Sequence, residues 1–229
     1  MVTMAALHAL TAELHGGMLT LAFIAIMIVA LAQIAVRLRN RMPKRLVKAA
    51  IQVRGYAEAT GYFASIAGLV GLLLSAYTGM YAWPTDVLVN DPVIQNKILL
   101  TAFSTCFWIG VVVIRTRFGR GLWACPSMAM LYTVLTMAGF GLVGLTGSLG
   151  AHLRPGGGGS VLDPFWNFLH IDVAKTMSLA PTVAAIVAMV SVVAFIISLA
   201  IARRYELFGA KLGAETCEKY FRWDEPRIP

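Results

Sequence analysis

The stretch GMLTLAFIAIMIVALAQIAVRLRNRMPKRLVK, residues 17–48, joins a long apolar segment to a dense basic one. The apolar part, Gly17 to Leu38, meets the roughly 20 apolar residues that a helix needs to cross a bilayer core about 30 Å thick. Lysines and arginines follow it immediately. This order predicts a transmembrane helix that ends at a cationic membrane surface.

The rest of the chain repeats this pattern. Hydrophobic residues make up 59% of the 229 residues and charged residues only 13%, against about 25% charged residues in a typical soluble domain. We therefore predict an all-α, polytopic membrane bundle that forms a single membrane domain over 1–229. The five expected spans are 17–38, 60–83, 98–114, 123–149 and 181–202.

The positions of the charged residues predict how the bundle is oriented. The net charge is +8, but the basic residues lie between the spans and form no patch for a nucleic-acid partner. Of the 19 lysines and arginines, 16 follow spans one, three and five, and only Lys97, Arg154 and Lys175 fall on the other side. The positive-inside rule then places the N-terminus outside and the tail, 203–229, in the cytoplasm. We expect an integral, multi-pass protein of the cytoplasmic membrane.

The segments outside the spans carry further expectations. The N-terminus has no cationic region before its apolar run, which favours retention of span one over cleavage as a signal peptide. The three cysteines offer no pair in an outer loop, so no disulfide is expected. Asp163 as a cap and Pro164 at the first helical position predict a short outer interfacial helix over about 164–178.

All four histidines fall on the predicted outer side. His15 precedes span one, His152 follows span four, His170 precedes span five, and His8 lies on an N-terminal tail that we expect to be unanchored. Neutral imidazole is a common transition-metal ligand and an axial ligand of haem iron. An imidazole also suits the membrane interface without binding anything, because it has an apolar body and a polar tip.

Glycines line two of the expected spans. Gly141, Gly144, Gly147 and Gly150 recur every third residue in span four, and span two offers Gly68, Gly71, Ser75 and Gly79. Small residues are enriched where membrane helices contact each other, so helix packing is the expected main use of both stripes. The outer end of span four, Gly147 and Gly150, also leaves space for a planar macrocycle below His152, with Arg154 placed to pair with a haem propionate.

In these features the chain resembles the small cytochrome b subunits of membrane oxidoreductases, which are bundles of four or five helices with an outside N-terminus. The resemblance implies haem b, a respiratory electron-transport chain, quinone, and other subunits of a membrane complex as partners. In the nitrate-reductase type, histidines about half a membrane apart on two helices hold two stacked haems. This chain has no histidine in the cytoplasmic half of any span, which argues against a two-haem path across the bilayer.

Three functions remain open on these grounds. The first is a haem-b-binding subunit of a respiratory or quinone-linked complex, with His15 and His152 as axial ligands, His170 as the alternative ligand, and the redox site at the outer face. The second is a non-catalytic structural subunit that positions neighbouring helices. The third is an outer-face copper or iron site in which Glu13 or Asp172 joins the imidazoles. A transporter is disfavoured, because no ionisable residue is expected near the centre of a span.

Overall fold

The computed structural model describes residues 3–123, 126–153, 159–170 and 189, and in these residues it contains helices and no strand. Four helices of the described part are long and apolar enough to cross a membrane, which confirms an all-α bundle with membrane-spanning character. The predicted fifth span (181–202) and the tail (203–229) lie outside the described residues, except for Met189. The helices are α1 (Met4–Arg37), η1 (Arg39–Arg41), α2 (Lys44–Ala82), α3 (Thr85–Asn90), α4 (Pro92–Phe118), η2 (Gly119–Trp123), α5 (Pro126–His152) and α6 (Asp163–Phe168).

The first two helices form a hairpin that is longer than the sequence predicts. Thr3 caps α1, its hydroxyl accepting a hydrogen bond from the Ala6 N–H at 3.2 Å, so the helix begins at Met4 instead of Gly17. Likewise α2 begins at Lys44, 16 residues before the expected span. At 1.5 Å per residue the 34 residues of α1 measure about 51 Å and the 39 of α2 about 58 Å. Both helices therefore exceed a bilayer core of about 30 Å.

Glycines on α2 bring the two helices of the hairpin into close contact. A Cβ atom on Gly68 would overlap the side chain of Leu19, and one on Gly61 would lie 3.1 Å from Ile26 Cγ1. Gly71 faces the backbone of His15 in the same way. The expected packing role of the small residues in span two is confirmed at Gly68 and Gly71.

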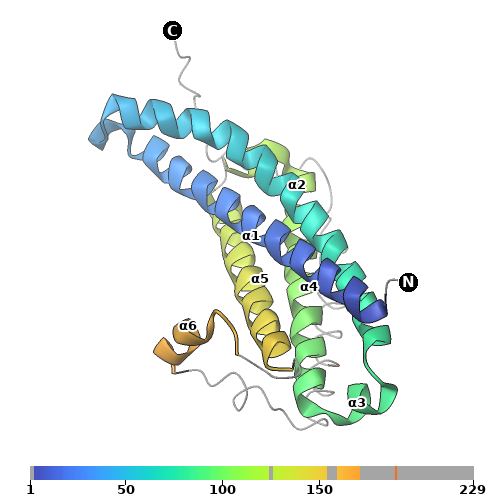
Figure 1. The fold of residues 1–229 in the computed structure, drawn as a ribbon. Coiled ribbons are helices and arrows are strands. Elements are labelled where there is room, and N and C mark those ends of the chain that lie inside the picture. The colour runs from blue at the N-terminus through green and yellow to red at the C-terminus, as the bar shows by residue number, and fades with distance from the viewer. Residues whose placement is uncertain (1–2, 124–125, 154–158, 171–188, 190–229) are drawn as a thin grey trace.

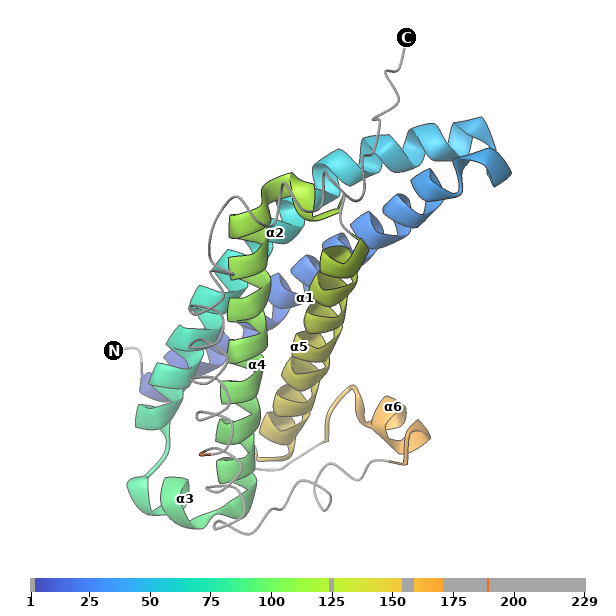
Figure 2. The same cartoon turned by 180° about the vertical axis from the view of Figure 1, so that it is seen from behind.

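The helices α4 and α5 form a second pair that crosses behind this hairpin (Figures 1 and 2). Asp91 caps α4 by accepting hydrogen bonds from the N–H groups of Val93 and Ile94, and Pro92 occupies the first turn. The pair is joined to the hairpin by a buried core that draws on all four long helices. Its largest members include Leu19, Leu72, Trp108 and Tyr132.

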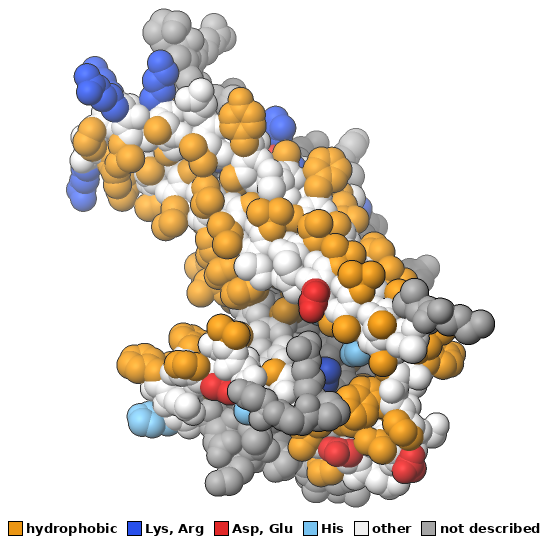
Figure 3. All heavy atoms as spheres, in the orientation of Figure 1, with side chains coloured by type: hydrophobic (Ala, Val, Ile, Leu, Met, Phe, Trp, Pro, Cys, Tyr) orange, Lys and Arg blue, Asp and Glu red, His pale blue; other side chains and the backbone are white. Residues whose placement is uncertain are grey.

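The chain direction gives the bundle two chemically different ends. The basic end is where α1 and α4 finish and α2 and α5 begin, and it carries the lysines and arginines of residues 37–48 and 115–120. The histidine end is where α1 and α4 begin and α2 and α5 finish. Apolar side chains cover much of the surface between them (Figure 3), as lipid contact requires.

Candidate functional site at the histidine end

Two imidazoles lie on α1, and each forms a hydrogen bond from Nδ1 to a backbone carbonyl oxygen. Nδ1 of His8 is 2.9 Å from the carbonyl oxygen of Ser75 on α2, and Nδ1 of His15 is 2.9 Å from that of Thr11, one turn earlier on α1. A carbonyl oxygen only accepts, so Nδ1 carries the proton in each ring. In a neutral imidazole, Nε2 then keeps its lone pair. The expectation that His8 lies on an unanchored tail is wrong, because α1 extends to Met4 and Ser75 fixes the ring.

His152, the second expected ligand, is held by the segment that follows α5. His152 Nε2 lies 3.2 Å from Asp163 Oδ1, and the other carboxylate oxygen of Asp163 accepts a hydrogen bond from the Ser160 N–H at 2.7 Å. The carboxylate accepts from Nε2–H, which leaves the Nδ1 lone pair of a neutral His152 available. The structure therefore gives His15 and His152 different hydrogen-bond partners, and their pairing stays a prediction.

The helix α6, which carries Asp163, docks against α5. Trp166 is 7% exposed and its indole N–H donates to the hydroxyl of Ser148 at 2.8 Å. The same indole ring lies 3.5 Å from a Cβ built on Gly144, so the missing side chain at Gly144 makes room for α6. Asp163 and Pro164 do begin a helix, as predicted, although the turn at Leu162 takes the cap position.

The remaining predicted site residues have different surroundings. His170 lies beyond the end of α6, exposed and with a left-handed φ of 56°, and not on the helix itself. Arg154 and the rest of the predicted helix after residue 170 fall outside the described residues. Gly147 faces open space.

Gly150 faces a lysine from α4, which sequence reasoning did not assign to the site. Lys97 Nζ is 2.9 Å from a Cβ built on Gly150, and Lys97 lies close enough for its charge to act on both His8 and His15. The space at Gly150 is therefore occupied by an ammonium group and is not a bare surface for a macrocycle. Lys97 is one of only three cations that the charge distribution predicts on this side of the membrane. That rarity is the feature of the sequence that could have pointed to Lys97.

A second group missed by sequence reasoning is the neighbour of Lys97 on α4. Asn96 is 2% exposed, and within the described part of the chain neither its amide nitrogen nor its amide oxygen has a hydrogen-bond partner. A buried amide without partners costs free energy unless water or a ligand satisfies it. The histidine end thus combines imidazoles, an ammonium group and an unsatisfied amide.

A compact site for copper or iron is not evident in the described part of the chain. There, no three side chains of His, Cys, Asp or Glu lie together so that they could hold a metal ion. Glu13 is exposed on α1, and Asp172 lies outside the described residues.

The basic end holds buried charges that the sequence analysis placed in a loop. Glu58 lies within α2, is 7% exposed, and forms ion pairs with Arg115 on α4 and, at 3.1 Å, with Arg120 on η2. The guanidinium group of Arg115 also lies 5.1 Å above the ring of Tyr62. Glu58 and Arg115, 57 residues apart in the chain, lie just outside the predicted spans 60–83 and 98–114, so the expectation that no ionisable residue lies near the centre of a span is not contradicted.

A buried amide continues this polar layer into α1. Gln33 donates from Nε2 to the carbonyl oxygen of Trp123 at 3.1 Å and accepts from Arg54 Nη1 at 2.7 Å. The layer therefore links α1, α2, α4 and η2. Glu58 pairs with two of its arginines and Gln33 accepts from the third, Arg54, which indicates a structural role at this end.

No protein-family model, curated protein or solved structure matches this chain. The functional argument therefore rests on the side chains at the histidine end.

Proposed function

We propose that the chain is a haem-b-binding subunit of a respiratory or quinone-linked electron-transfer complex in the cytoplasmic membrane, with its redox site at the outer face. The observation that carries the proposal is the hydrogen bonding of the histidines. His8, His15 and His152 each have one ring nitrogen on a backbone carbonyl or a carboxylate. Metal-ligating histidines almost always make such a bond, because it fixes the tautomer and turns the other nitrogen toward the metal.

His15 and His152 are the proposed axial ligands, through Nε2 and Nδ1 respectively. They belong to α1 and α5. These two helices contact each other where the rings of Phe23 and Phe140 stack, with their centroids 4.1 Å apart. Lys97 supplies a cation beside Gly150 on α5 for a propionate group. When bound, haem b supplies one-electron transfer. The chain supplies the ligands, holds their ring orientation, and sets the charge around them.

Visible spectroscopy of the purified full-length protein, before and after dithionite, tests the proposal. We expect sharp α and Soret bands in the reduced protein. His15→Ala and His152→Ala should each abolish the low-spin spectrum, because each removes one axial ligand. His170→Ala should leave the spectrum intact, because its ring lies beyond α6.

The choice of His15 over His8 needs its own comparison, since the structure anchors both rings. His8→Ala should retain the low-spin bands, and a loss of bands in His8→Ala with retention in His15→Ala would contradict the assigned pair. Asp163→Asn adds a readout other than haem content. Losing the carboxylate makes His152 a weaker donor to the iron, so the midpoint potential should rise while haem stays bound.

Haem absent from the protein isolated with its native partners would refute the proposal. Copper or iron found by elemental analysis in that haem-free protein would support an outer-face metal site. Absence of both would leave the structural subunit that positions neighbouring helices.

A further inference from the structure

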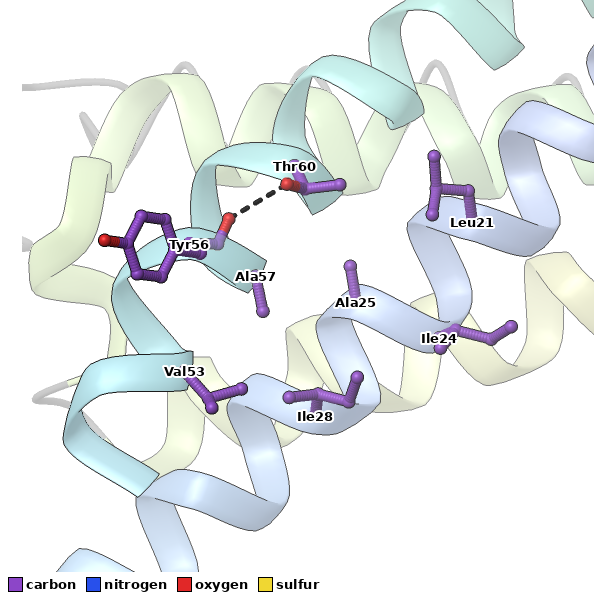
Figure 4. Close-up of a pocket in the computed structure, with 8 residues that line it drawn as sticks. All are labelled: Leu21, Ile24, Ala25, Ile28, Val53, Tyr56, Ala57 and Thr60. Atoms are coloured by element: carbon purple, nitrogen blue, oxygen red, sulfur yellow. Dashed lines mark hydrogen bonds between the residues drawn. The ribbon is translucent and has the colours of Figure 1, made fainter. Parts of the chain in front are cut away.

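The α1–α2 hairpin carries an apolar groove on its outer surface, toward the basic end. Its volume is about 310 Å³, and its walls come from α1, including Leu21 and Ile28, and from α2, including Val53. Figure 4 shows Ala25 on α1 and Ala57 on α2 pointing toward one another across the gap. The two short side chains leave the hollow that the longer apolar residues border.

The groove offers almost nothing to a polar ligand. The hydroxyl of Thr60, which lines it, donates to the carbonyl oxygen of Tyr56 at 3.0 Å and is satisfied within α2 (Figure 4). The other walls are aliphatic or aromatic. An occupant of this groove therefore has to be a flexible apolar chain, which gains free energy as its methylene groups are buried.

Cations stand directly beyond the groove on the same helix. Arg45 lies eight residues before Val53, and Lys48 lies eight before Tyr56, so each cation is about 12 Å from a groove residue along the helix axis and about 80° around it. Lys48 is only five residues from Val53, about 7.5 Å along the helix axis. Both cations are exposed, and the sequence has no acidic residue between Glu13 and Glu58.

We propose that this groove and the adjacent cations form a binding site for an acidic glycerophospholipid, with one acyl chain in the groove and the anionic headgroup at Arg45 and Lys48. The apolar walls select the chain, and the positive charge of the exposed Arg45 and Lys48 selects the negative headgroup. The site lies in the bilayer leaflet at the basic end. It involves neither the histidines nor a haem.

Native mass spectrometry of the full-length protein in detergent tests the site, with phosphatidylglycerol and phosphatidylcholine of identical acyl chains as probes. Two cations near a headgroup contribute about 1 kcal/mol each, so phosphatidylglycerol should bind about thirty-fold more tightly. The double variant Arg45→Gln/Lys48→Gln should remove this preference. Arg117→Gln, at an exposed cation at the end of α4, should leave it unchanged.

A second variant tests the groove itself. Ala57→Leu fills the hollow and should weaken both lipids to the same extent, whereas Ala67→Leu, at an exposed position ten residues further along α2, should weaken neither. Equal binding of the two lipids by the wild type would overturn the proposal. A preference for phosphatidylglycerol that persists in Arg45→Gln/Lys48→Gln would also overturn it. If Ala57→Leu does not fold, the result from Arg45→Gln/Lys48→Gln alone tests the proposal.

Discussion

Replacing Glu58 with alanine is expected to destabilise the bundle more than any change at an exposed charge. The carboxylate is 7% exposed, and the side chain of its partner Arg115 is 12% exposed. Removing one partner of a buried pair leaves an uncompensated buried charge, which costs about 3–5 kcal/mol. The second ion pair adds little, because the Arg120 side chain is 78% exposed and exposed pairs contribute about 0–1 kcal/mol.

The free energy of unfolding, measured by titrating the purified protein from mild detergent into SDS, gives this loss directly. Glu58→Leu should cost at least as much as Glu58→Ala, whereas the double variant Glu58→Leu/Arg115→Leu should recover part of it, because neither charge is then left unpaired. Arg120→Gln is the matched control and should lose less than about 1 kcal/mol.

The reasoning depends on the buried guanidinium group being neutralised by Glu58. A loss below about 1 kcal/mol in Glu58→Ala would show that Arg115 reaches solvent or another anion. A loss in the double variant equal to the sum of the losses in Glu58→Leu and Arg115→Leu would show that the two residues act independently. Either result would refute the proposed coupling.

Two further predictions concern helix packing and orientation. Gly68→Ala should lower the free energy of unfolding by about 1–3 kcal/mol, because its Cβ would overlap Leu19. Gly55→Ala, whose Cβ meets open space, should be neutral or stabilising. Equal effects of the two variants in the SDS titration would remove the packing argument. In intact cells, a membrane-impermeant thiol reagent should label Gly157→Cys and not Arg45→Cys, as the charge distribution predicts; the reverse pattern would invert the topology and the proposed outer site with it.

The sequence was sufficient to predict the helical class, four long apolar helices and the packing role of Gly68 and Gly71 on α2. These features depend on apolar composition and residue size along the chain. The helix starts at Met4 and Lys44 could not be found from apolar runs, because polar residues such as Glu13 and Glu58 interrupt the runs without interrupting the backbone hydrogen bonds of a helix.

The candidate site was predicted in part for a related reason. Clustering of the histidines at one end followed from counting spans, but their partners did not. Ser75 lies 67 residues from His8, and the contact of Lys97 with Gly150 joins α4 to α5. Such contacts depend on how the helices pack in three dimensions, and a single sequence gives no measure of that packing.

The distance along the chain between Glu58 and Arg115 has a consequence for biosynthesis. At about 5–20 residues per second, a ribosome completes Arg115 roughly 3 to 11 seconds after Glu58. In the later part of that interval, once Ala82 completes α2, the α1–α2 hairpin is present without the guanidinium group that neutralises its carboxylate. Gln33 likewise lacks its hydrogen-bond acceptor until the carbonyl group of Trp123 has been synthesised. The first hairpin is therefore an incomplete insertion intermediate, and a chain truncated before residue 115 should be a substrate for membrane quality-control proteases.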